Sequence, residues 1–296
     1  MRVASVGDRV ASGSHALLAR YGRAANYEGP SGLLSIVTES VGEGPVNIVL
    51  SGVSAPAASV VRVEDGAVWI GGRRFATSGV PVYSSDVRNL GIEPRVLPSG
   101  LAVLEEALGR EAPPRSLAFL LDRARLGEFR TPFERDFARR AAAGARALFS
   151  GDEIGGARRL RGCGFGLTPS GDDFLCGVMI GLNALDVWSG GRLGPSIRRI
   201  RAAAGGGGVM SRTYLDLAAE GRAQATVRDL LDAIARGSAD HPIPAVRRLL
   251  SHGATSGADL AVGLAMALRR PLGRAARAFR RGAPGETALW EVRWSS

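Results

Sequence analysis

The sequence contains no lysine. Its 38 basic residues are all arginine, and they outnumber the 28 acidic residues to give a net charge of +10. Such a charge suits a nucleic-acid-binding protein, but a surface selected to hold phosphate backbones has no reason to exclude lysine, which binds phosphate well as a point charge. The arginines are also scattered along the chain. We therefore attribute the missing lysine to coding bias in a GC-rich genome and expect no nucleic-acid partner.

Cysteines, histidines and long apolar runs are also few. Cys163 and Cys176 form no CxxC pattern, which argues against a zinc knuckle or a disulfide framework. The three histidines share no metal-ligand spacing. The longest apolar run, residues 174–185, is too short to span a membrane, and no basic-then-apolar signal segment begins the chain. These absences predict a cytoplasmic protein without a membrane partner.

The hydrophobic pattern changes near residue 97. Before it, short β-branched runs alternate with turns, and Asp65-Gly66 between two of the runs is a hairpin signal. Residues 10–21 fit either a helix or a further strand. Five or more short, closely spaced strands favour a small β-barrel or sandwich. The expected strands are Leu33–Thr38, Val46–Leu50, Ser59–Val63, Ala67–Ile70 and Val80–Tyr83.

From Ser99 onward, apolar residues recur at helical spacing. We expect Gly109 to end the first helix and Pro132 to occupy the first position of the third. The expected helices are Leu101–Leu108, Leu117–Ala124, Phe133–Leu148, Ser170–Trp188, Met210–Ala219, Ala225–Ala235, Ala245–Leu250 and Ser256–Arg269. The predicted fold class is therefore α+β, with a β-rich N-terminal module over residues 1–97 and an all-helical C-terminal domain over residues 98–296.

The segment from Gly162 to Asp173 is the most informative part of the chain, and it reads Gly-Cys-Gly-Phe-Gly-Leu-Thr-Pro-Ser-Gly-Asp-Asp. Its alternating glycines permit close approach of the backbone to a ligand. The helix that follows offers unpaired N–H groups and a favourable dipole to an anion. Two adjacent carboxylates, Asp172 and Asp173, exceed what helix capping needs. They could hold a Mg²⁺ ion that bridges to phosphate, or accept hydrogen bonds from the N–H groups of a substrate.

Two familiar phosphate-binding loops are excluded for this segment. No Gly-Lys-Ser/Thr follows the glycines, so it is not a Walker A loop. Residues 153–161 before it have a helical pattern, whereas a dinucleotide fingerprint follows a strand.

A weaker copy of the pattern lies downstream. Ser256-Gly257-Ala258-Asp259 is followed by Gly263, as Ser170-Gly171-Asp172-Asp173 is followed by Gly177. Each Ser-x-x-Asp also fits an ordinary capping box, as does Ser150-x-x-Glu153. Small residues recur on both helices, so we expect the two helices to pack together and to bring their N-termini to one end. A site is then expected between these N-termini.

A third hydroxyl-rich turn, Ser211-Arg212-Thr213-Tyr214, begins another helix. Its arginine could bind a carboxylate or a phosphate through two hydrogen bonds. The alternative is a helix cap with a solvated arginine. His252 lies just before the second motif.

These motifs together resemble a known family. Gly162-x-Gly164-x-Gly166-Leu167-Thr168-Pro169-x-x-Asp172-Asp173 resembles the signature of the AllH family. Thr255-Ser256-Gly257-x-Asp259 is similar to the second motif of that family, and Ser211-x-x-Tyr214-Leu215 with Ala218-Ala219-x-Gly221 is similar to a third. Arg23-Ala24-Ala25-Asn26 and Gly44-Pro45 look like its N-terminal pattern. The resemblance thus extends over nearly the whole chain.

The resemblance implies a subunit of a multi-protein oxamate carbamoyltransferase. Its reaction interconverts oxalurate plus phosphate with oxamate plus carbamoyl phosphate. The implied partners are an acyl-CoA-synthetase-like subunit and one further subunit, besides the small anionic substrate. The family often has His directly before the second motif, where this chain has Ala254. The chain therefore lacks that histidine, and His252 lies two positions earlier.

Carbamoyl transfer requires an anion site and donors for a tetrahedral oxyanion. We expect Asp172 or Asp173 to act on the substrate NH₂ group and Arg212 to hold a carboxylate. Two other functions remain open: a non-catalytic assembly or ligand-sensing subunit, and a stand-alone Mg²⁺-dependent phosphate or nucleotide enzyme. The candidate substrate-binding residues are Gly164, Gly166, Thr168, Ser170, Ser211, Arg212, Thr255, Ser256, Gly257, Asp259 and Asn26.

Overall fold

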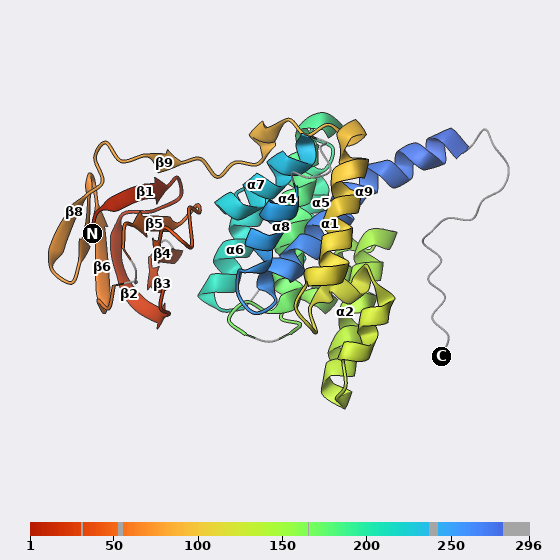
Figure 1. Cartoon of the computed structure of the whole chain (residues 1–296), viewed down its shortest axis with the longest axis horizontal. Coiled ribbons are helices and arrows are strands. Elements are labelled where there is room, and N and C mark those ends of the chain that lie inside the picture. Colours follow the sequence, from red (N-terminus) through yellow and green to blue (C-terminus); the bar gives the residue numbers. More distant parts are fainter. Residues whose placement is uncertain (31, 53–55, 165, 206, 237–241, 281–296) are drawn as a thin grey trace.

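The computed structural model describes residues 1–30, 32–52, 56–164, 166–205, 207–236 and 242–280. It confirms the α+β class. A curled β-sheet forms the N-terminal part, and helices pack together to form the rest (Figure 1). Each part buries its own apolar core.

The strands of the sheet lie between residues 3 and 83. Its order is β8-β7-β6-β2-β3-β4-β5-β1-β9, and among these neighbours β4 and β5, like β1 and β9, pair in parallel, while the other neighbours are antiparallel. One face buries large apolar side chains such as Tyr27, Ile36 and Ile48. The strand bounds are β1 (Val3–Gly7), β2 (Gly13–Arg20), β3 (Ala24–Gly29), β4 (Gly32–Thr38), β5 (Asn47–Leu50), β6 (Val60–Glu64), β7 (Ala67–Ile70), β8 (Arg73–Ala76) and β9 (Val82–Tyr83).

All five predicted strands are present, although β9 is shorter than its prediction. The Asp65-Gly66 hairpin is confirmed, with Gly66 at a φ of 73° between the antiparallel strands β6 and β7. The undecided segment 10–21 contains β2. Strands β1, β3 and β8 were not predicted. Strands β3 and β8 contain no β-branched residue, and pairing with neighbouring strands decides their conformation instead. Strand β1 has two valines, Val3 and Val6, but they are separated by the small residues Ala4 and Ser5.

The helical part begins at Leu97. Its longest buried element is α4, which has few exposed positions. The helices are α1 (Leu97–Glu111), α2 (Pro132–Ser150), α3 (Glu153–Leu160), α4 (Ser170–Ser189), α5 (Gly194–Ala204), α6 (Val209–Ala219), α7 (Ala225–Ala235), α8 (Pro242–Leu250) and α9 (Ser256–Arg280), with short 3₁₀ helices η1 (Arg88–Leu90), η2 (Pro94–Val96), η3 (Leu117–Leu120) and η4 (Arg123–Glu128).

Two helix predictions are wrong. Gly109 does not end the first helix, because α1 continues to Glu111 and buries Leu104 and Leu108; a glycine inside a helix costs only about 1 kcal/mol, which such packing offsets. The helix expected over residues 117–124 is instead the pair of short 3₁₀ helices η3 and η4. Pro132 does occupy the first turn of α2 as predicted.

The predicted capping boxes are also wrong for two of the three helix starts. The N-cap of α4 is Pro169, with no side-chain cap, so Ser170 and Asp173 do not form a box. Ser150 is the last residue of α2, and Asp152 caps α3 by accepting from Gly155. In the second motif, Asp259 accepts from a neighbouring element instead of its own first turn. The motif carboxylates are therefore free for contacts between elements.

Helices α4 and α9 pack against each other as predicted from their small residues. A Cβ on Gly177 would collide with the carbonyl oxygen of Leu260, and one on Gly263 would collide with the carbonyl oxygen of Phe174. The same contact thus occurs twice with the roles of the two helices exchanged. Both N-termini lie at one end, where the hydroxyl oxygens of Thr168 and Ser256 are 3.2 Å apart.

The sheet contacts the helices mainly through β4 and the loop before β5. Leu33 and Val46 pack against Leu217 of α6. The hydroxyl of Tyr83 donates to the carbonyl of Ala223 at 2.9 Å. Figure 1 shows the sheet beside the helices, with β3 and β4 closer to the helices than β8.

Candidate functional site

The loop between α3 and α4 carries the first motif. Gly162, Gly164 and Gly166 have φ values of 61°, 117° and 91°, the left-handed region that favours glycine. A Cβ on Gly164 would also lie 2.8 Å from the backbone nitrogen of Ser170. The glycines therefore let the loop fold tightly over the start of α4.

Asp172 connects this loop to α6 through hydrogen bonds. One carboxylate oxygen accepts from the backbone nitrogen of Gly162 at 2.7 Å, and the other accepts a short hydrogen bond from the hydroxyl of Ser211 on α6. The side chain is buried. Asp172 thus joins the first motif to the third.

Asp173 has a different environment. Its carboxylate accepts from the hydroxyl of Thr168 at 3.1 Å, and the hydroxyl of Ser256 lies against it from α9. Burial raises the pKa of Asp173 well above its usual range, and the nearby carboxylates of Asp259 and Asp172 raise it further. A carboxyl group with a raised pKa is suited to proton transfer near neutral pH.

Asp259 occupies the equivalent position at the start of α9. It accepts from the backbone nitrogen of Leu117 at 2.6 Å, and the hydroxyls of Ser170 and Thr255 lie beside it. Burial raises the pKa of Asp259 to about 7, against the effect of these hydrogen bonds. Each motif serine therefore lies beside the aspartate of the other helix.

The third motif and the N-terminal pattern meet at α6. Burial raises the pKa of Tyr214 to about 12, and its hydroxyl lies beside Ser35 of β4. Ser35 in turn donates to the side-chain oxygen of Asn26 at 2.8 Å, and the amide nitrogen of Asn26 lies 3.8 Å from the sulfur of Met210. This chain of contacts fixes Tyr214 against the sheet.

A cavity of about 240 Å³ opens where these elements meet. Four of the predicted residues line it: Thr168, Asp173, Ser256 and Gly257. The loop before β5 contributes Pro45. Its other lining residues are Cys176, Ile180, Met210, Tyr214, Leu217, Arg222, Ala223, Gln224, Val227, Leu249, His252, Gly253 and Leu260.

The remaining predicted residues do not line the cavity. Arg212 is exposed to solvent, while Asn26 and Ser211 are buried behind the wall as braces. Asp172, Ser170 and Asp259 likewise hold the helix starts in place. Gly164, Gly166 and Thr255 belong to the loops above them.

Two polar lining residues, Arg222 and Gln224, were missed by the sequence reasoning. They lie in the turn between α6 and α7, and neither forms a motif. The one available signal was Gly221, which takes a φ of 71° and so reverses the chain just before Arg222.

The charges around the cavity are largely paired. A guanidinium nitrogen of Arg222 lies 3.0 Å from Asp8, and another lies 3.8 Å from Asp86. Burial lowers the pKa of His252, and the positive charge of Arg23 lowers it further. At neutral pH the imidazole is therefore uncharged. His241 lies outside the described residues.

The structure offers little support for a metal at the aspartate pair. No group of three or more His, Cys, Asp or Glu side chains placed to hold an ion occurs in the described ranges. Both oxygens of Asp172 already accept from protein donors.

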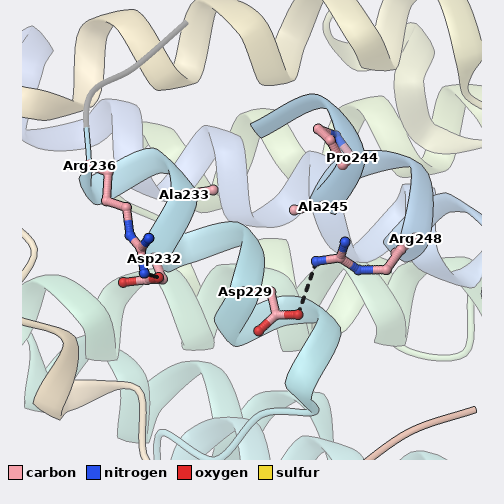
Figure 2. Close-up of a pocket in the computed structure, with 7 residues that line it drawn as sticks. All are labelled: Asp229, Asp232, Ala233, Arg236, Pro244, Ala245 and Arg248. Carbon is pink, nitrogen blue, oxygen red and sulfur yellow. Dashed lines mark hydrogen bonds and ion pairs between the residues drawn. The ribbon is translucent and has the colours of Figure 1, made fainter. Parts of the chain in front are cut away.

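A second hollow of about 200 Å³ lies between α7 and α8 (Figure 2). Its charged side chains pair with one another: Arg248 lies 3.0 Å from Asp229, and Arg236 forms a close ion pair with Asp232. It contains no motif residue. We therefore take the larger cavity as the candidate site.

Comparison with known proteins identifies one family. Residues 160–268 match the family described as oxamate carbamoyltransferase subunit AllH, which confirms the AllH resemblance over that range. The range includes all three helical motifs. No curated protein and no solved structure matches the chain. Within the described residues, no helix is long and apolar enough to cross a membrane.

Proposed function

We propose that this chain, whose residues 160–268 match the AllH family, is a subunit of an oxamate carbamoyltransferase. We further propose that its 240 Å³ cavity binds the small anionic substrate. One observation carries the proposal: residues from all three helical motifs of the AllH resemblance, together with Pro45 from the loop before β5, line a single cavity.

The proposed reaction joins oxamate to the carbamoyl group of carbamoyl phosphate. The amide nitrogen of oxamate attacks the carbamoyl carbon, the bond from that carbon to the phosphate oxygen breaks, and the nitrogen loses a proton. The products are oxalurate and phosphate, and the reverse reaction runs through the same steps. The site must therefore move one proton and stabilise one tetrahedral oxyanion.

Asp173 is the proposed catalytic residue for the proton. Its carboxylate faces the cavity, and its raised pKa makes it a stronger base than an ordinary aspartate. In one direction it accepts the proton from the amide nitrogen, and in the other it returns it. Gln224 and Tyr214 are further polar groups of the wall that could orient the substrate.

The oxyanion donors are proposed to come from the two helix starts. The hydroxyls of Thr168 and Ser256 are hydrogen-bonded to Asp173 in this structure, so each would donate to the oxyanion only after turning away from that carboxylate. Gly257 lines the same wall. Helix N-termini favour developing negative charge through their N–H groups and dipoles. Gly164, Gly166 and Thr255 would support this arrangement from the loops.

Asp172 is proposed as a positioning residue, because both its oxygens are occupied by Gly162 and Ser211. Asn26 acts similarly through Ser35 and Tyr214. The exposed Arg212 would serve at most the outer surface. An acyl-CoA-synthetase-like subunit and one further subunit are the proposed partners.

The test compares single substitutions in the reconstituted complex, assayed with carbamoyl phosphate and oxamate. Asp173→Asn should lower kcat by about 100-fold or more, the usual contribution of a general base. Asp172→Asn should act mainly through stability. Asp136→Asn on α2 is the matched control, since that side chain is 69% exposed.

Full activity of Asp173→Asn would overturn the proposed role of the cavity. It would favour the second candidate, a non-catalytic subunit whose motifs only order the helices. A specific observation supports that alternative: Asp172 and Asp259 are both used to join separate elements.

A further inference from the structure

The larger cavity extends along α4 for about two turns. Its wall includes Asp173, Cys176 and Ile180, which are three and four residues apart and therefore share one face of that helix. The backbone rises by about 10 Å over the seven residues from the first to the last. The cavity thus has one end at the helix starts and another end further along α4.

Helix α6 runs beside α4 in the same direction. Near the starts of both helices, Ser211 donates a hydrogen bond to Asp172. About three turns along α4, Asn183 donates to the carbonyl of Ala218, near the end of α6, at 3.0 Å. Leu217 therefore lines the cavity at the end away from the helix starts.

The two ends of the cavity differ in polarity. At the helix starts, Thr168 and Ser256 bring hydroxyl groups beside the carboxyl group of Asp173. At the other end, α4 and α6 line the cavity with branched aliphatic side chains, Ile180 and Leu217. Both of these are buried. A carboxylate placed between them would lose its hydration without gaining a donor from either side chain.

Two other polar side chains of the wall already have partners. Gln224 lies beside the hydroxyl of Tyr214. Arg222 lies 3.0 Å from Asp8 and 3.8 Å from Asp86, so two carboxylates compensate its charge. An uncharged, apolar part of a ligand therefore suits the aliphatic end of the cavity better than an anionic group.

We propose that the site also takes primary carboxamides with a short aliphatic substituent, which place the amide at Asp173 and the substituent between Ile180 and Leu217. This inference rests on the proposed function, and it names a further class of acceptor for the carbamoyl group of carbamoyl phosphate. The amide nitrogen bonds to the carbamoyl carbon, the bond from that carbon to the phosphate oxygen breaks, and the nitrogen gives up one proton. The products are an N-acylurea and phosphate.

NMR titration of the purified full chain with acetamide, propionamide and butyramide tests the proposal. Each added methylene should tighten binding about fourfold, or about 15-fold from acetamide to butyramide, as expected when apolar groups leave water. A second pair of ligands tests the aliphatic end by charge at constant shape. Isobutyramide has the branching of oxamate with two methyl groups in place of the carboxylate oxygens, and it should bind more tightly than oxamate.

The substitution Ile180→Thr makes the aliphatic end smaller and more polar. It should reduce the gain from acetamide to butyramide by about threefold or more. The matched control is Ile197→Thr on α5, because Ile180 is 3% exposed and Ile197 is 4% exposed, but Ile197 does not line the cavity. The control should keep the full gain.

Equal affinity of the wild-type chain for acetamide and butyramide would overturn the proposal. Binding of oxamate as tight as that of isobutyramide would also overturn it, as would a full gain in Ile180→Thr.

These outcomes are separable from that of the carbamoyltransferase assay. If the gain is absent while the complex carbamoylates oxamate and Asp173→Asn abolishes that activity, the proposed function stands and the aliphatic acceptor class fails. If the gain is present while Asp173→Asn keeps full activity, the aliphatic end of the site stands and the proposed chemistry fails.

Discussion

The starts of α4 and α9 have nearly the same local sequence but different surroundings. At α4, Asp173 faces the cavity, and the preceding Asp172 fastens the glycine loop to α6. At α9, Asp259 is fully buried and accepts from η3, and the preceding residue is Ala258. One aspartate is thus available to a ligand, while its counterpart is enclosed.

The two starts are nevertheless built in the same way. Gly171 packs against the last carbonyl of α3, and Gly257 packs against the carbonyl of Leu249 near the end of α8. Ser170 lies beside Asp259, and Ser256 lies beside Asp173. A repeated motif can thus supply the frame of a site twice while only one copy presents its carboxyl group to the cavity.

The largest effect is expected from the pH dependence of the enclosed copy. Because burial raises the folded pKa of Asp259 to about 7, its stabilising contribution is complete below its unfolded pKa near 4 and is lost as the pH rises through 7. Asp259→Asn keeps the oxygen that accepts from Leu117 but removes the ionisation. The variant should gain stability over the wild type between pH 5 and 8, by an amount on the order of a few kcal/mol.

Denaturant unfolding at several pH values measures this difference. The wild-type midpoint should fall as the pH rises, while that of Asp259→Asn should change less. The control is Asp136→Asn, whose side chain is largely exposed. A constant difference between wild type and Asp259→Asn at all pH values would contradict the expectation.

The second prediction concerns the two close contacts between α4 and α9, one at Gly177 and one at Gly263, and whether they stabilise the protein equally. Gly177→Ala and Gly263→Ala each place a Cβ against a backbone carbonyl that cannot move aside easily. Each should lower the free energy of unfolding by about 2 to 3 kcal/mol. Gly109→Ala in α1, where a Cβ meets nothing within 4 Å, should be neutral or stabilising by up to about 1 kcal/mol.

Thermal and denaturant unfolding of the three variants supply the measurement. A destabilised Gly177→Ala beside an unaffected Gly263→Ala would show that the exchanged contacts are not equivalent. The similarity between α4 and α9 would then be limited to their first turns.

Periodicity and glycine placement predicted much of this architecture. The helical spacing located α4, α6 and α7 closely, and the small residues of α4 and α9 correctly predicted their packing. These features could be predicted because they depend on residues near one another in sequence or on a repeated pattern. The helix end predicted at Gly109 was wrong because tertiary packing overrode a weak local preference.

The site itself was harder to predict from the sequence. The Ser-x-x-Asp spacing fits local capping, yet the side chains pair across helices, which only the packing of α4 on α9 decides. Arg222 and Gln224 reach the cavity from a turn whose position depends on contacts with the sheet, including that of Tyr83 with Ala223. No residue pattern within the turn records those contacts.

The smallest expected effect concerns His252, which lines the cavity just before α9. Burial is the main cause that lowers the pKa of His252, and the charge of Arg23 adds to it. Arg23→Gln removes the second cause alone, so the pKa of His252 should rise by a few tenths of a unit, as expected for a screened charge near the surface. Titration of the imidazole by NMR measures the change. The control is Arg74→Gln, which changes an exposed arginine of strand β8. An unchanged pKa would mean that Arg23 points away from His252 in solution. The N-terminal part of the chain would then contribute only Pro45 to the cavity wall.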